Sequence, residues 1–461
     1  MNIPMGDNRA MTDEFETEPQ PPAKPEPVKD TRPSILFAAP MNILDITSGA
    51  ALSMRTLLAA LASRGYRAVA VQAQLFDSDQ GAEHVIEAGS DPSVKDKQIL
   101  RAEVLGVEHF IIRTKATKRP DMTSGEEEIF LRRFHEELAY RRPDMVILWG
   151  GLLLEMTVMR EARAAGIPVL FYLVNAGYEH KETFRDVSVV ITDTQATADL
   201  YRQRHGLICH AVGKFIDPNL VKAPERKPDF ITFINPSFEK GVNVFMPLAK
   251  LAAQECPEIK FLVVQSRGRW GQALQVLKFK PEDFPNVRVI GHQKNMKPVY
   301  GATRALLLPS VWHESGARVI AEAMINGIPV LASKTGGSAE LVGQGGVIFE
   351  LPEVVKERRD LPASEDVVRP WLEEIKRIWN DPAYYEALCQ RVEVEAQQHD
   401  IQRSTDRFIA AVSPAVRASK QAQQARQAAM QPPPSQKPAG DMKSAVKDAL
   451  AKKQKRHAKG R

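Results

Sequence analysis

The sequence predicts an α/β protein with two domains, each built around a doubly wound parallel sheet. Three observations lead to this prediction. The 461 residues are enough for two or three domains of about 150 residues each. Short runs that are apolar throughout alternate with amphipathic helical stretches, as is typical of parallel strands covered on both faces. The alternation starts again after 213–229, a proline-containing stretch that we interpret as a hinge.

The first unit opens with an apolar strand run at 34–40 and a loop containing Ser48-Gly49. An amphipathic helix follows at 52–63, and Arg64-Gly65 is a typical signal for its end. Five further apolar runs predict the remaining strands of this unit: 68–72, 110–113, 145–149, 169–173 and 187–192. Helical periodicity predicts three helices between them: 126–141, 152–165 and 195–205.

The second unit repeats the pattern. Six apolar runs predict its strands: 230–235, 260–265, 287–290, 305–308, 329–332 and 346–349. Helical periodicity predicts a helix at 241–254 and another that starts at Glu314. Further helices within 366–411 are predicted to close the fold. In two such units, ligands bind in the cleft at the carboxyl ends of the strands.

The domain limits follow from these patterns. We predict five segments: a disordered acidic and proline-rich tail at 1–30, an N-terminal acceptor domain at 31–213, a C-terminal donor domain at 214–395, a closing helix at 396–413 and a disordered basic tail at 414–461.

The composition is that of an ordinary globular protein, with 43% hydrophobic and 26% charged residues. It excludes collagen-like, disulfide-framework and mostly disordered proteins. The three cysteines are far apart and form no CxxC pair, which argues against a zinc ribbon and favours a reducing compartment. The most apolar run, Ile167–Val174, is far shorter than the roughly 20 residues that span a bilayer. With no secretory signal at the N-terminus, we expect a cytoplasmic location.

The net charge of +5 is concentrated in the tails. Residues 1–30 carry a net −4 and residues 414–461 a net +10, so the body at 31–413 is nearly neutral. Charge therefore gives no support to nucleic-acid binding by the folded body. We favour a solubilising role for the basic tail, and its alternative is peripheral contact with anionic lipid at the inner face of the membrane.

The most informative stretch runs from His313 to Ala332. On a helix that starts at Glu314, the side chains of Glu314, Arg318 and Glu322 share nearly one face. The backbone amides of Ser315 and Gly316 would then point out of the helix N-terminus and bind a diphosphate, while Glu322 accepts hydrogen bonds from ribose hydroxyls. The alternative is a surface helix with Glu–Arg pairs at i, i+4.

This stretch resembles the E-x7-E signature of glycosyltransferase family 4, also called glycosyltransferase group 1. These retaining enzymes use nucleotide sugars and have the GT-B fold, in which two Rossmann-like domains face a cleft. Further phrases agree with the family in order between residues 34 and 412: Ser48-Gly49-Ala50, Arg64-Gly65-Tyr66, Arg142-Pro143-Asp144, Gly166-Ile167-Pro168, Thr192-Asp193-Thr194, Ile216-Asp217-Pro218, Glu239-Lys240-Gly241 and Gly336-Gly337 with Glu340.

The resemblance implies a role for each matching residue. Lys240 would contact the donor diphosphate with help from Arg318, and Gly49 would lie in the loop under the donor phosphates. Glu314 would hold hydroxyls of the donor sugar, and Glu322 the ribose. The resemblance also implies retention at the anomeric carbon, a UDP- or GDP-linked donor as substrate, no cofactor and no bound metal. The acceptor would be a glycan, a lipid-linked molecule or a small molecule.

Two positions depart from the family pattern. The family usually has an arginine five residues before the lysine of its "EKG" phrase, where this sequence has Asn235. Arg267 and Arg269 are candidates to replace that cation, although we favour a solvated loop for both. Many members also place a histidine near the acceptor, where this sequence has Val174-Asn175. His180 could replace it.

Other signals are weaker. Asp77-Ser78-Asp79 formally matches a DxD metal motif of another glycosyltransferase fold, and we interpret it as a polar loop. His292 follows a strand near the expected base site, and Trp149 ends a strand at the expected cleft. The sequence shows no P-loop or HExxH motif. A GxGxxG motif is also missing after the first strand, which argues against an NAD-dependent dehydrogenase.

Three alternatives to a glycosyltransferase stay open. The first is another GT-B enzyme, such as a sugar-nucleotide epimerase or a phosphorylase. The second is a catalytically degenerate protein that binds a sugar nucleotide, which the departures at Asn235 and Val174 suggest. The third is a scaffold that works through its charged tails.

Overall fold

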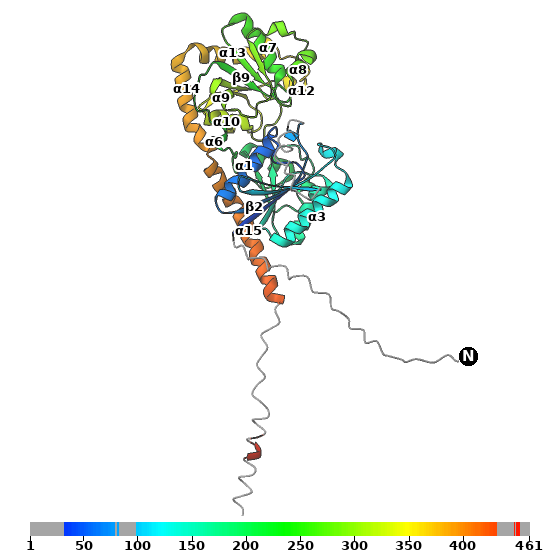
Figure 1. Cartoon of the computed structure of the whole chain (residues 1–461). Coiled ribbons are helices and arrows are strands. Elements are labelled where there is room, and N and C mark those ends of the chain that lie inside the picture. Colours follow the sequence, from blue (N-terminus) through cyan, green and yellow to red (C-terminus); the bar gives the residue numbers. More distant parts are fainter. Residues whose placement is uncertain (1–31, 79–80, 83–97, 431–446, 448, 452–461) are drawn as a thin grey trace, which may run out of the picture. The chain divides into compact units, whose positions relative to one another are not determined.

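The computed structural model describes residues 32–78, 81–82, 98–430, 447 and 449–451. Within these residues the chain forms two sheets, each with helices against it (Figure 1). We call β1 to β8 (34–211) with their helices the N-terminal domain, and β9 to α14 (230–395) the C-terminal domain. Both lie in the unit Pro33–Arg461. The predicted fold class is confirmed, while the predicted domain limits stay a prediction.

The N-terminal sheet has eight strands in the order β3-β4-β2-β1-β5-β6-β7-β8. Its strands are β1 (Ser34–Ala38), β2 (Arg67–Ala73), β3 (Ile99–Val104), β4 (Val107–Ile112), β5 (Met145–Leu148), β6 (Val169–Leu173), β7 (Val189–Thr192) and β8 (Cys209–Ala211). Its helices are α1 (Gly49–Ser63), α3 (Ser124–Arg141), α4 (Leu153–Ala164) and α5 (Gln195–His205).

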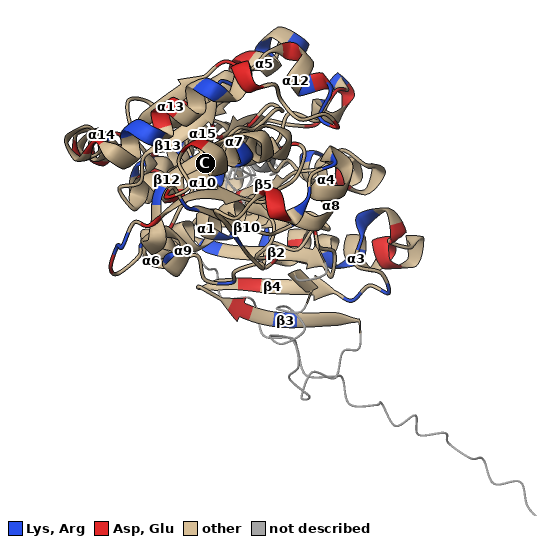
Figure 2. Ribbon diagram, turned by 90° about the horizontal axis from the view of Figure 1, so that it is seen from above, with Lys and Arg blue, Asp and Glu red and all other residues tan. Residues whose placement is uncertain are grey.

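The strand β3 is an exception to the predicted parallel sheet. It pairs with β4 in the antiparallel direction at the edge of the sheet, and the sequence analysis missed it and the short β8. Figure 2 shows charged residues on β3 next to β4. Arg101 and Glu103 are exposed there, so the strand lacks the continuous apolar run from which the other strands were predicted. Such charges protect an edge strand from pairing with another chain.

The C-terminal sheet has six parallel strands in the order β11-β10-β9-β12-β13-β14. They are β9 (Phe230–Ile234), β10 (Phe261–Val264), β11 (Val287–Ile290), β12 (Thr303–Leu308), β13 (Val330–Ser333) and β14 (Gly346–Phe349). The helices from the hinge onward are α6 (Pro218–Val221), α7 (Val242–Glu255), α8 (Trp270–Leu277), α9 (Lys297–Ala302), α10 (Arg318–Ile325), α11 (Ser338–Val342), α12 (Glu353–Glu357), α13 (Glu365–Asn380) and α14 (Pro382–Glu395).

The helix α15 (Ile401–Met430) extends beyond residue 414, where the basic tail is predicted to begin. It continues through Pro414 because its later turns have partners on the N-terminal domain. Ser419 donates a hydrogen bond to the Gly166 carbonyl at 2.6 Å, and Lys420 pairs with Asp144 at 2.7 Å. The predicted tails otherwise lie almost entirely outside the described residues. Within the described part of the chain, no helix is both long and apolar enough to cross a membrane.

Two buried histidines predict that stability falls in mild acid. Burial, together with the charge of the neighbouring Arg55, lowers the pKa of His109 to about 4, and burial likewise lowers the pKa of His399 to about 4. Both stay neutral in the fold while the unfolded chain takes up protons near pH 6.5, so stability is lost as pH falls from 6.5 towards 4. We expect each histidine to lower the free energy of unfolding at pH 5 by roughly 2 kcal/mol relative to pH 7.5.

Denaturant unfolding at pH 7.5 and 5.0 tests this expectation. His109→Gln should reduce the loss of unfolding free energy between the two pH values, whereas the same change at the exposed His135 should not. The expectation would be contradicted if the free energy of unfolding depended on pH equally in the wild type and in His109→Gln.

Candidate functional site

A cavity of about 550 Å³ lies at the carboxyl ends of strands from both sheets. On the N-terminal side it is lined by the loops after β1, β2, β5 and β6 and by the first turn of α1. On the C-terminal side it is lined by the loops after β9, β10, β11 and β12 and by α10. This is the position that a doubly wound parallel sheet gives to a ligand site.

Glu314 and Lys240 form an ion pair in the C-terminal half of the cavity, with 2.6 Å between Lys240 Nζ and Glu314 Oε1. Ser310 Oγ donates to the same oxygen at 2.6 Å, and Trp312 Nε1 donates to it at 3.1 Å. Burial raises the pKa of Glu314, which is 4% exposed, but Lys240 and the two other donors outweigh burial and hold that pKa below its usual value. Glu314 is therefore a fixed anion, and Oε2 can still accept hydrogen bonds from a ligand.

Glu314 precedes the helix rather than starting it, which corrects the sequence analysis. The helix α10 begins at Arg318. In a helix, the Glu314 carbonyl would accept from the amide four residues later, but here it accepts from the Gly337 amide at 2.7 Å. The Ser315 carbonyl likewise accepts from Thr194 Oγ1 at 2.7 Å. The backbone from Glu314 to Gly316 is thus held by tertiary contacts.

The glycine at 336 makes this arrangement possible. A Cβ atom on Gly336 would lie 2.3 Å from the Glu314 carbonyl oxygen, and its φ of +53° is rare for residues with a side chain. The helix that follows Gly336 also contacts the N-terminal domain. Its Glu340 accepts hydrogen bonds from the amides of Gln195 and Ala196 at the start of α5. The loop that carries Glu314 is therefore braced by both domains.

Glu322 lies on α10, 6% exposed, and lines the cavity as predicted. Its Oε1 accepts from Arg318 Nε and its Oε2 from the Tyr300 hydroxyl, both at 2.5 Å. Arg318 also donates to the Phe215 carbonyl at 2.9 Å. Each carboxylate oxygen can accept a second hydrogen bond, so Glu322 can still bind hydroxyls. Arg318 lines the cavity but is largely engaged with protein groups.

The N-terminus of α1 points at the cavity. Ser48 caps the helix by accepting from the Ala51 amide, and Ser48, Gly49 and Ala51 all line the cavity. A Cβ atom on Gly49 would meet no atom within 4 Å, so a ligand can approach the backbone closely there. The free amides and the dipole of this helix favour an anion.

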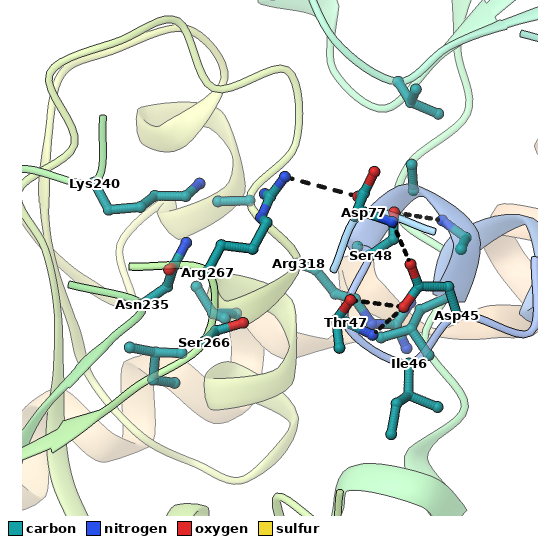
Figure 3. Close-up of a pocket in the computed structure, with 18 of the residues that line it drawn as sticks. Asp45, Ile46, Thr47, Ser48, Asp77, Asn235, Lys240, Ser266, Arg267 and Arg318 are labelled. Carbon is teal, nitrogen blue, oxygen red and sulfur yellow. Dashed lines mark hydrogen bonds and ion pairs between the residues drawn. The ribbon is translucent and has the colours of Figure 1, made fainter. Parts of the chain in front are cut away.

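Asn235, Arg267 and Asp77 also line the cavity. Figure 3 shows Arg267 and Lys240 extending from the C-terminal domain towards the same space, with Asp77 on the opposite side. Arg267 pairs with Asp77 at 3.7 Å between Nη1 and Oδ2. Asp77, which was predicted to lie in a polar loop, therefore forms an ion pair in the cavity. Asp79 lies outside the described residues.

Three predicted site residues lie outside the cavity lining: Ser315, His180 and Arg269. Ser315 is buried, and it contacts the N-terminal domain through its carbonyl. His180 is exposed at the start of a short 3-10 helix at Lys181–Phe184, so this geometry does not support it as a replacement for the missing histidine. Arg269 is exposed before α8.

The other residues singled out from the sequence do line the cavity: Trp149, Val174, Asn175 and His292. Trp149 also packs against Phe37, with ring centroids 5.1 Å apart. Burial lowers the pKa of His292.

Sequence reasoning missed two residues of the site. Asp45 fixes the loop after β2, because its Oδ2 accepts from the Asp77 amide at 2.8 Å and its Oδ1 accepts from Thr47. Tyr300 binds Glu322. Neither belongs to a recognisable motif, and each acts through a partner distant in sequence. Within the described residues, no group of three or more His, Cys, Asp or Glu side chains is placed to hold a metal ion.

Comparison with known proteins adds a family match and a set of similar folds. Residues 229–358 match the family model described as glycosyl transferases group 1. No curated protein matches the chain. The solved structures that are similar include HepE from Anabaena in complex with UDP and glucose, at 16% identity and a TM-score of 0.58 over 83% of this chain and 100% of that one.

Two further structures extend this comparison. A glycosyltransferase from Rickettsia africae has 10% identity and a TM-score of 0.59, with 84% of this chain and 99% of that one covered. Sucrose-phosphate synthase from Thermosynechococcus elongatus has 16% identity and a TM-score of 0.55, with 86% and 100% covered. At these identities the likeness establishes the fold.

Proposed function

Since residues 229–358 form a glycosyl transferases group 1 domain in a chain with the GT-B fold, we propose that this protein is a retaining glycosyltransferase. It transfers a sugar from a nucleoside diphosphate donor to a hydroxyl group of an acceptor, without a bound metal. The observation that carries the proposal is the arrangement of Lys240, Glu314 and Glu322 around one cavity at the strand ends.

The C-terminal half of the cavity binds the donor in this proposal. Glu322 accepts hydrogen bonds from the ribose, and the open Oε2 of Glu314 accepts from hydroxyls of the sugar. The diphosphate lies between Lys240 and the N-terminus of α1 at Gly49, and the amide of Gly316, which also lines the cavity, can donate to it. We propose UDP as the nucleotide before GDP, because HepE was solved with UDP.

In the transfer step, the bond between the anomeric carbon and the diphosphate oxygen breaks, and its electron pair stays on the diphosphate. Lys240 and the α1 amides stabilise that developing charge, which is the kind of fixed electrostatic contribution that dominates many enzymes. With retention, the acceptor hydroxyl attacks from the face that the diphosphate leaves. Its proton can therefore pass to the departing oxygen as the new bond forms.

The acceptor enters from the N-terminal side of the cavity, next to Trp149, Asn175 and Tyr178. In this proposal the acceptor is a hydroxyl-bearing glycan, lipid-linked molecule or small molecule. Peripheral membrane contact through the basic tail and a cytoplasmic location stay predictions.

A nucleotide screen tests the proposed function. We expect UDP and a UDP-sugar to raise the melting temperature and bind in calorimetry with EDTA present, and the binding to weaken in Glu322→Gln. Product analysis with donor alone separates the alternatives, since an epimerase changes the donor sugar. A transferase releases UDP and needs an acceptor for full turnover. Failure of UDP, GDP and ADP and their sugars to bind would overturn the proposal.

A further inference from the structure

The loop after β10 carries a cation into the donor half of the cavity. Arg267 lines the cavity together with Lys240, and both side chains extend towards the same space (Figure 3). The family pattern has a second cation near the diphosphate at the position of Asn235, where this chain has none. Resting on the function proposed above, we propose that Arg267 supplies the second cation for the donor diphosphate, and that Asp77 holds it while no donor is bound.

Asn235 builds the loop that presents Arg267. Its φ of +63° lies in the left-handed region, which asparagine tolerates better than arginine does. Its side-chain oxygen accepts a hydrogen bond from the Gly268 amide at 2.7 Å. The residue that replaces the family's arginine therefore fixes the backbone directly after Arg267.

The loop is closely packed and braced at a second point. A Cβ atom on Gly268 would lie 2.4 Å from the backbone of Pro236 and Ser237, so no other residue fits there without a shift. Gln265 Oε1 accepts from the Trp270 amide at 3.0 Å. The segment at 236–237 also leads directly to Lys240, since Ser237 Oγ accepts from the Lys240 amide. Arg267 and Lys240 thus stand on two loops in direct contact.

The pair between Arg267 and Asp77 is suited to being exchanged for a ligand. The Arg267 side chain is 52% exposed and the ion pair is 3.7 Å long, so it contributes little stability. A guanidinium binds phosphate oxygens through two parallel N–H groups, a stronger contact than this one. The ion pair of Lys240 is less easily exchanged for a ligand, because its partner Glu314 is buried and accepts hydrogen bonds from two further donors.

The test measures the binding of UDP and GDP against uridine and guanosine by calorimetry. Arg267→Ala should weaken binding of the diphosphate about tenfold or more and leave binding of the nucleoside unchanged, because only the phosphate contacts are lost. Arg269→Ala is the matched control, since Arg269 is exposed two residues away and outside the cavity lining. It should leave both affinities unchanged. Arg267→Lys should recover part of the loss.

Asp77→Asn tests the second half of the proposal. This change removes the charge and keeps the backbone amide that Asp45 binds. Diphosphate affinity should rise about two- to fivefold, because the competing ion pair is gone. A fall in that affinity would overturn the role given to Asp77.

The outcomes separate this inference from the proposed function. Wild-type affinity for UDP and GDP in Arg267→Ala, or an equal loss for diphosphate and nucleoside, would overturn the inference and leave the proposed function standing. A wild-type protein that binds no nucleoside diphosphate would overturn both.

Discussion

Glu322→Gln is expected to bind the nucleotide sugar about 10- to 100-fold more weakly than the wild type. A hydrogen bond to a charged group contributes about 1.5–3 kcal/mol, and the change removes the charge that the ribose hydroxyls would meet. Calorimetry with UDP measures the effect. Glutamine is preferable to alanine, because alanine would leave the Tyr300 hydroxyl and the Arg318 guanidinium buried without the partner that Glu322 gives them.

Tyr300→Phe is the control for this variant. It removes one donor to Glu322 and leaves the carboxylate in place, so its UDP affinity should stay within about threefold of wild type while its stability falls by about 1 kcal/mol. If both variants lost affinity equally, the effect would come from the buried network around Glu322 rather than from contact with ribose.

Lys240→Met is expected to lower kcat by about 100- to 1,000-fold, the range found when a donor aimed at developing charge is removed. Donor affinity should fall less than kcat, because the diphosphate gains charge as the bond to the sugar breaks. Steady-state kinetics of UDP release measure both. Lys240→Arg should retain part of the activity. Lys250→Ala removes a half-buried lysine of α7 that pairs with Asp283 and does not line the cavity, and it should leave kcat unchanged.

The same variant should change the pH profile. Burial raises the pKa of Glu314, and Lys240 is the largest of the contacts that hold it low. Without Lys240, Glu314 should take up a proton at higher pH, so the acid limb of kcat moves to higher pH than in the wild type. A profile identical to that of the wild type would contradict the assignment of Glu314 as an anion that depends on Lys240.

The elements that sequence reasoning predicted well are those whose periodicity depends on burial on both faces. β1, β5, β6, β9 and β12 consist mostly of buried apolar residues and lie within the sheets. The edge strand β3 was missed because two of its six residues, Arg101 and Glu103, are charged and exposed, which interrupts its apolar run. The closing helix is predicted to end at 413, but α15 continues to Met430. Its turn at Ser419 and Lys420 contacts Gly166 and Asp144, which lie more than 250 residues earlier in the chain.

The predicted site residues divide in the same way. Lys240, Glu314 and Glu322 were found because they lie in one short motif or at a strand end, and all three line the cavity. The helix start at Glu314 was wrong, because the carbonyls there bind Gly337 and Thr194 instead of their own helix. His180 was placed by proximity to a strand end, but the chain after β6 carries it to the surface.

By itself the sequence determined that the chain forms two doubly wound sheets, that residues 229–358 match the glycosyl transferases group 1 family model, and that Lys240, Glu314 and Glu322 are candidate site residues. Those properties depend on local periodicity and on short motifs. Only the tertiary structure decided which of Arg267 and Arg269 lines the cavity, that Asp77 faces Arg267, and that Tyr300 and Arg318 share Glu322. Each of these depends on loops from different strands meeting at the sheet ends, and the direction of a side chain in such a loop is set by packing against distant residues.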